Sequence, residues 1–184
     1  MIELANEKEL AERAPKDAEA FAALYDFYFP KIWAYTIRRI GHTETAEDIV
    51  SQIFLKITEA LPRRKNNAPF GAWVFRIATN TIIDYYRSHG RRREEEIVSA
   101  EAIPEQGLGP DEFTEARMMF CEIEKILAEL PKRDERCVHL KFFAGLNNGE
   151  IAEIENLKEG NVAIIVHRAL QKIRENSKFY GKQQ

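Results

Sequence analysis

The chain has 184 residues, of which 45% are hydrophobic and 31% charged, and its formal net charge is −3 at pH 7. These values predict a folded protein with one domain or two small ones, and no apolar run is long enough to suggest membrane insertion. The only cysteines, Cys121 and Cys137, have no metal-ligand spacing, and the acidic N-terminus is unlike a signal peptide, so a cytoplasmic protein without a metal is expected.

The first long helix is predicted from about Asp17 to Ile40, with Pro30 introducing a kink or a break. Its inner side is expected to hold Phe21, Leu24, Tyr25, Tyr28, Ile32, Tyr35 and Ile37. Gly41 marks its end and Thr43 is the expected N-cap of the next helix. That second helix, from Glu44 to about Leu61, should bury Ile49, Ile53, Phe54 and Ile57.

A third helix begins near Phe70 and lies within a strongly basic segment. Residues 62–93 contain eight lysines or arginines and a single acid, so a nucleic-acid site can lie in a protein that is acidic overall. The helix should carry a polar and aromatic stripe of Trp73, Arg76, Asn80, Asp84 and Arg87. Arginines neutralise phosphates and aromatic rings stack on unpaired bases, so this stripe suits an opened DNA strand. The alternative is a solvated face above an ordinary core.

Residues 94–117 are interpreted as a flexible linker. They carry eight acids and one arginine, contain two prolines and two glycines, and lack a sustained hydrophobic period. We therefore predict an all-α protein with two small helical domains, residues 1–93 and 118–184, joined by an acidic tether.

The second domain is expected to contain a helix-turn-helix. Asn147 and Glu150 have capping-box spacing, and a longer helix follows from Glu159. Its apolar face should comprise Val162, Val166, Ala169, Leu170 and Ile173, opposite a polar and cationic stripe. The second helix of such a motif enters the DNA major groove, although an ordinary helical hairpin has the same pattern.

Several of these segments resemble the bacterial RNA polymerase sigma factors of the extracytoplasmic-function group. The resemblance is carried by residues 45–56, by FGAWVFRIATN at 70–80 with IDYYR at 83–87, and by Leu130-Pro131, Arg136, Glu150-Ile151-Ala152 and His167-Arg168-Ala169-Leu170. It spans about residues 18–175 in the family's order. The chain departs from the family at Ser51-Gln52, where many members have Gln-Glu.

The resemblance implies that the protein binds core RNA polymerase and promoter DNA, and is restrained by an anti-sigma factor. Core polymerase would contact Asp48, Ser51, Gln52, Phe54 and Leu55. The minus-ten element would be read and melted by Arg63, Arg64, Asn66, Asn67, Trp73, Arg76, Asn80, Asp84, Arg87, Arg91 and Arg92. The minus-thirty-five element would meet Asn161, Ile164, His167, Arg168 and Lys172.

No catalytic constellation is apparent. The four histidines are scattered, a glycine-rich phosphate loop is absent, and neither a cofactor nor a metal is expected. The alternatives to a sigma factor are a stand-alone helix-turn-helix regulator and a helical protein-interaction adaptor.

Overall fold

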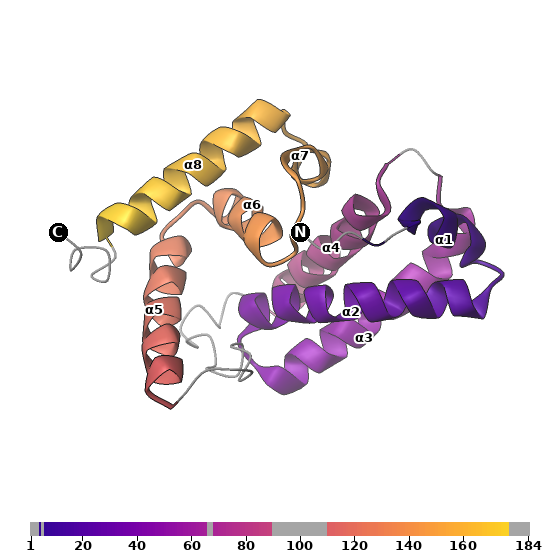
Figure 1. Ribbon diagram of the computed structural model, residues 1–184, viewed down its shortest axis with the longest axis horizontal. Coiled ribbons are helices and arrows are strands. Elements are labelled where there is room, and N and C mark those ends of the chain that lie inside the picture. The colour runs from indigo at the N-terminus through magenta and orange to yellow at the C-terminus, as the bar shows by residue number, and fades with distance from the viewer. Residues whose placement is uncertain (1–3, 5, 66–67, 90–109, 177–184) are drawn as a thin grey trace.

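The computed structural model describes residues 4, 6–65, 68–89 and 110–176, with the backbone alone for 110–118, and this part of the chain is all-helical. Its elements are α1 (Glu7–Arg13), α2 (Ala18–Ile40), α3 (Thr43–Ala60), a short 3-10 helix (Leu61–Arg63), α4 (Phe70–His89), α5 (Pro110–Ala128), α6 (Lys132–Phe142), α7 (Asn148–Glu155) and α8 (Glu159–Asn176). Figure 1 shows α1–α4 in one half of the molecule and α5–α8 in the other. The predicted all-α class is confirmed. None of the described helices combines the length and hydrophobicity needed to cross a membrane.

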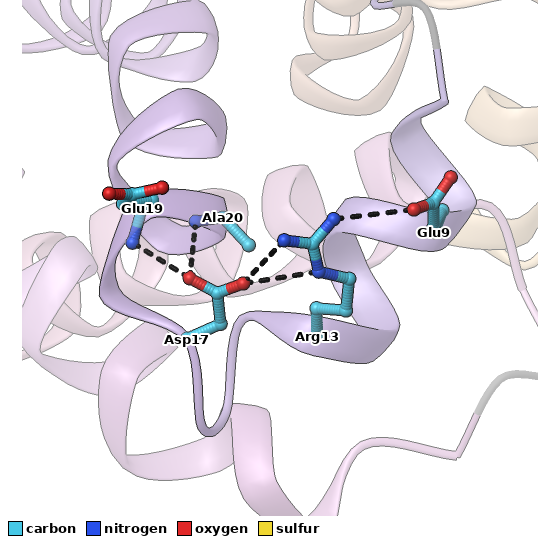
Figure 2. A network of polar contacts seen from close by, with 5 residues as sticks. All are labelled: Glu9, Arg13, Asp17, Glu19 and Ala20. Atoms are coloured by element: carbon cyan, nitrogen blue, oxygen red, sulfur yellow. Dashed lines mark hydrogen bonds and ion pairs between the residues drawn. The ribbon is translucent and has the colours of Figure 1, made fainter.

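A polar network fixes the turn between α1 and α2. One carboxylate oxygen of Asp17 accepts hydrogen bonds from the backbone N–H groups of Glu19 and Ala20, at 3.0 and 3.2 Å, and so caps α2. The other oxygen accepts a 2.7 Å bond from Arg13, whose guanidinium also reaches Glu9 (Figure 2). The backbone donors and the guanidinium lower the pKa of the Asp17 carboxyl.

Helix α2 differs from its prediction at Pro30 and at Tyr25. It continues through Pro30 as one element, so of the kink or break predicted there, the break is wrong. A proline inside a helix removes a backbone hydrogen bond and costs about 3 kcal/mol. Here the ring is exposed, and burial of Tyr28 and Ile32 on either side holds the helix against the core. Tyr25, expected on the inner side, is 37% exposed.

Two helix starts also differ from the sequence interpretation. The N-cap of α3 is His42 rather than Thr43, because the His42 ring accepts a 3.5 Å hydrogen bond from the Thr45 N–H. The stop at Gly41 is confirmed, with a φ of 75° that glycine adopts without strain. Helix α5 begins at Pro110, inside the segment interpreted as a linker. Proline suits a first helical turn, where its missing N–H would have no partner.

The helix-turn-helix forms as predicted, with one exception. The Asn147 side chain accepts from the Glu150 N–H at 2.9 Å, and the Glu150 carboxylate accepts from the Asn147 N–H at 2.8 Å. Asn156 then ends α7 in a left-handed conformation, with φ 54°. On α8, Val162, Val166, Ala169 and Ile173 are buried as expected, whereas Leu170 is 44% exposed. Leu170 lies at the edge of the apolar face and meets solvent there.

The largest hydrophobic core continues through both halves of the molecule. Buried residues of α1–α4 form one cluster with residues of α6–α8 and the α6–α7 loop, which include Cys137, Leu140, Leu146, Ile151 and Val162. A smaller cluster joins α5, α6 and α8. The hydrophobic pattern of the sequence gives no indication of this contact between the halves.

Candidate nucleic-acid and polymerase interface

Arg64 contacts residues at the start of α4 and just before it. Its guanidinium donates a 2.6 Å hydrogen bond to the Ala68 carbonyl and lies 5.1 Å from the centre of the Phe70 ring and 5.6 Å from that of Trp73. Burial lowers the pKa of Arg64. Its guanidinium lies close enough to both ring centres for a cation–π interaction. Arg63, next to it, is exposed. The predicted strand-binding residues Asn66 and Asn67 lie outside the described residues, as do Arg91 and Arg92.

Most of the residues of the stripe predicted on α4 lie on the solvent side of the helix. Asn80, Asp84 and Arg87 are exposed at successive helical turns, and Asp84 pairs with Arg87 at 3.6 Å. Trp73 is half-buried, with its ring 5.5 Å from that of Phe70. The opposite face of the helix supplies core, through Val74, Phe75, Ala78 and Ile82. The stripe therefore offers amide, charged and aromatic groups along one line, a set that can contact bases and phosphates together.

Arg76, in the middle of this stripe, is held by the other half of the molecule. Its guanidinium donates a 2.9 Å hydrogen bond to the Glu153 carbonyl of α7 and lies 3.9 Å from the Glu153 carboxylate. No pattern in the sequence predicts this contact, because 77 positions separate the two residues along the chain.

The outer face of α3 carries the residues expected to contact polymerase. Asp48, Ser51 and Gln52 are exposed, and Leu55 is 60% exposed. Phe54 is half-buried instead, because its ring lies 4.5 Å from that of Tyr25 and 6.0 Å from that of Phe29. Together these side chains form a mixed apolar and acidic surface on α3 and the adjoining turn of α2.

The outer stripe of α8 is partly as predicted. Asn161, Ile164, His167 and Arg168 are exposed, and in Figure 1 α8 lies at the outside of the molecule. Lys172 is directed instead to Glu129, in the turn just after α5, at 2.9 Å, and its side chain is only a third exposed. This stripe presents an amide, an apolar side chain and a cation at helical spacing, which are groups that contact base edges, thymine methyls and phosphates.

An ion pair between α6 and the first helix of the helix-turn-helix is a structural feature that the sequence did not reveal. Arg136 of α6 donates two hydrogen bonds, of 2.9 and 2.7 Å, to the Glu155 carboxylate of α7. The carboxylate is almost fully buried, and its bonds raise the pKa of Arg136. The two residues lie on consecutive helices, 19 positions apart, so neither helical periodicity nor a capping pattern marks the pair.

Both halves of the chain match models of known families. Residues 24–92 match sigma-70 region 2, and residues 122–173 match sigma-70 region 4. The chain is 29% identical over 167 residues to the ECF RNA polymerase sigma factor BldN of Streptomyces coelicolor, covering 89% of this chain and 62% of that protein. It is 27% identical over 181 residues to the ECF RNA polymerase sigma factor SigW of Bacillus subtilis, covering 94% of this chain and 97% of that protein.

Solved structures share the fold. The structure of CnrH in complex with the cytosolic domain of CnrY matches with a TM-score of 0.68 at 23% identity, over 92% of this chain and 95% of that one. The sigma factor RpoE from Bartonella quintana, solved with the anti-sigma factor NepR, matches with a TM-score of 0.63 at 19% identity, over 84% of this chain and 94% of that one.

Proposed function

Because the chain belongs to the extracytoplasmic-function RNA polymerase sigma factors, non-enzymatic subunits that direct promoter-specific transcription initiation, we propose that three of its surfaces carry the separate steps of initiation. The assignment rests on the exposed stripe of α4, which lies within the region 2 match. A regulator consisting of a helix-turn-helix alone would leave residues 24–92 without a role.

Core polymerase docks on the outer face of α3. Leu55 and Phe54 supply the apolar centre of this contact, and Asp48, Ser51 and Gln52 supply its polar part. An exposed apolar side chain ringed by polar groups is the usual composition of a binding hot spot. Ser51 has no charge, so the contact relies on Asp48 for its electrostatic part.

The minus-ten element lies along α4. Asn80 contacts unpaired base edges, Trp73 provides a stacking surface, and Arg63, Arg76 and Arg87 neutralise phosphates. Asp84 orients Arg87 through their ion pair. Arg64 positions the loop that contains Asn66 and Asn67, and Arg91 and Arg92 complete the basic tract. Flipping a base costs a few kcal/mol of stacking, and this loop and α4 together offset it.

The minus-thirty-five element lies on α8. Arg168 contacts a guanine or a phosphate, Asn161 and His167 contact base edges or backbone, and Ile164 contacts a thymine methyl. Lys172 is a weaker candidate because Glu129 already engages it.

The arrangement of the chain and its partners follows from the same assignment. Residues 1–93 and 118–184 act as the two DNA-binding parts and residues 94–117 join them. An anti-sigma factor restrains the protein, as the relatives CnrH and RpoE were solved with the cytosolic domain of CnrY and with NepR. The protein acts in the cytoplasm, where core polymerase is found.

Capture of core polymerase, followed by run-off transcription from a promoter that depends on this chain, tests the whole assignment. A chain that binds duplex DNA alone but does not bind polymerase would contradict it.

Replacing Asn80 with alanine should weaken promoter opening. If Asn80 bonds an unpaired base, its loss should cost roughly 1–3 kcal/mol and relax the preference at one position of the minus-ten element. The measurement is permanganate reactivity of promoter thymines with the holoenzyme. Ser88→Ala, at an exposed position near the end of the same helix, is the control. Equal reactivity of the wild type and Asn80→Ala would exclude Asn80 from the strand path.

Replacing Arg168 with alanine should separate two kinds of groove contact. Loss of a guanine contact should cost on the order of 1–3 kcal/mol at one base position. Loss of a phosphate contact should weaken binding evenly across sequences and reduce the salt slope by about one. Holoenzyme affinity for promoter variants, measured at several salt concentrations, distinguishes the two cases. Unchanged transcription from a promoter that requires its upstream element would remove Arg168 from this role.

A further inference from the structure

The short helix α1 is fixed to the helical bundle by a hydrogen bond near the start of α4. The hydroxyl of Tyr28, on α2, donates to the carboxylate of Glu7, in the first turn of α1. Burial of Tyr28 and the Glu7 carboxylate raise the pKa of this hydroxyl, which therefore stays protonated and remains a donor. Leu10 and Ala11 of α1 pack against the core. Both packing and hydrogen bonding thus define the position of Glu7.

Tyr28 also contacts the first turn of α4. Its ring lies 5.5 Å from that of Phe70, the first residue of α4. A Cβ at Gly71 would lie 3.0 Å from the Tyr28 hydroxyl oxygen, a spacing at which one of the two groups would have to move. Glycine at this position lets the backbone of α4 approach the hydrogen bond between Tyr28 and Glu7. The start of α4 is therefore placed by the residue that α1 engages.

Arg64 connects the acids of α1 to Trp73. Its guanidinium lies near the Phe70 and Trp73 rings, at 5.1 and 5.6 Å from their centres. Burial lowers the pKa of Arg64, and the carboxylates of Glu7 and Glu12 oppose this effect, so both acids act on the guanidinium. An arginine held by carboxylates keeps one orientation, and its planar group then restrains the rings that it contacts.

The acids of α1 are poorly suited to contact DNA themselves. Three of the seven residues of this helix, Glu7, Glu9 and Glu12, are acids, and their charge repels phosphates. Arg13, at the end of the helix, pairs with Glu9 and Asp17. Helix α1 nevertheless contacts α4, the helix proposed to carry the opened strand. A role in placing side chains of α4, rather than in binding DNA, accounts for acids at this position.

We propose that Glu7 is a positioning residue of the minus-ten site. Through Tyr28 and Arg64 it holds the Trp73 ring and the first turn of α4 in the orientation that receives an unpaired base. This inference rests on the proposed function, because its consequence is expressed at the stacking surface of Trp73. A ring that is already restrained loses less conformational freedom when a base stacks on it. Helix α1 thereby strengthens the grip on the opened strand without touching it.

Fluorescence of Trp73 tests this positioning without DNA. Trp33→Phe leaves Trp73 as the only tryptophan of the full chain, and acrylamide quenching then measures the accessibility of its ring. Glu7→Ala should raise the quenching constant by roughly 1.5- to threefold, because Arg64 and the start of α4 lose the contact that restrains them. Glu7→Gln retains an oxygen that accepts from Tyr28 but lacks the charge near Arg64. Its quenching constant should lie between those of the wild type and Glu7→Ala.

The consequence for initiation is measured with the holoenzyme at a promoter that depends on this chain. Glu7→Ala should slow promoter opening about three- to tenfold and relax base preference at the position that stacks on Trp73. Affinity for core polymerase should stay within about twofold, because the outer face of α3 is unchanged. In a Trp73→Ala background, Glu7→Ala should have no further effect on opening, since both residues act on one contact.

Glu9→Ala is the matched control for the loss of an acid from α1. Glu9 is exposed on the same helix and pairs with Arg13, so its loss should alter neither quenching nor opening. Thermal melting establishes that each variant is folded. Unchanged Trp73 quenching in a folded Glu7→Ala variant would overturn the positioning role, as would an equal loss of opening with and without Trp73. Normal opening by Trp73→Ala would instead disprove the proposed stacking on Trp73, whereas the quenching measurement would still test Glu7.

Discussion

Asp48→Arg combined with Leu55→Arg should abolish binding of core RNA polymerase while leaving the fold intact. Both side chains are exposed on α3, and Leu55 has 60% of its surface in solvent, so neither change removes core packing. The variant inserts two cations where the proposed interface has an acid and an apolar centre. Loss of a hot spot together with like-charge repulsion should cost about 3–5 kcal/mol, or roughly a hundred-fold to a few thousand-fold in affinity. Titration of labelled protein with core polymerase measures the loss.

Phe54 is a poorer test residue, even though it belongs to the proposed contact. Its ring packs on Tyr25 at 4.5 Å, so Phe54→Ala would also leave a cavity beneath α3. Glu47→Arg provides the matched control, since it reverses an exposed charge one position away from Asp48, about a quarter turn around the helix. If the folded Asp48 and Leu55 variant binds within threefold of the wild type, the outer face of α3 is not the docking surface.

Arg136→Leu should be the most destabilising of the single substitutions considered. The Glu155 carboxylate, with 4% of its side chain exposed, would remain buried without its partner. Removing one member of a buried ion pair typically costs 3–5 kcal/mol, and the partial exposure of Arg136 places this case near the lower value. Urea unfolding followed by helicity should show the loss, and transcription from promoters that need the upstream element should fall with it.

The double variant Arg136→Leu with Glu155→Leu distinguishes an unpaired charge from lost packing. Replacing both partners with apolar side chains removes the buried charge, so much of the lost stability should return. Arg133→Leu, at an exposed position on the same helix, should change stability by less than about 0.5 kcal/mol. A double variant that is less stable than Arg136→Leu would contradict this explanation. It would mean that the ion pair itself, and not the avoidance of an unpaired carboxylate, stabilises the contact between α6 and the helix-turn-helix.

The sequence predicted the features that depend on neighbours along the chain. The capping box of Asn147 and Glu150 forms because both of its hydrogen bonds span three residues. The helix stop at Gly41 needs only a residue that tolerates positive φ. Likewise, the exposed line of Asn80, Asp84 and Arg87 follows from helical spacing. Charge segregation marked the basic α4 segment and the acidic residues that follow it, and together with the resemblance it identified the sigma-factor family.

Features that depend on the approach of distant segments required the tertiary structure. Periodicity gives the centre of an apolar face but not its width, so Tyr25 and Leu170 were assigned to the core although each lies at its edge. A proline tends to kink or end an isolated helix. Helix α2 nevertheless continues through Pro30, and the packing of Tyr28 and Ile32 against the core explains why.

The partners of charged side chains were decided in the same way. From the sequence alone, an arginine can equally contact a phosphate, remain a surface charge or form an ion pair. Its side chain is long, so its partner depends on which groups the fold places near it. The structure places Arg136 against Glu155 and Arg38 over Phe143. It also places Arg76 on α7, across 77 positions of the chain. Helices and their exposed stripes were thus encoded locally, whereas the contact between the two DNA-binding halves emerged only when segments remote in sequence packed into one core.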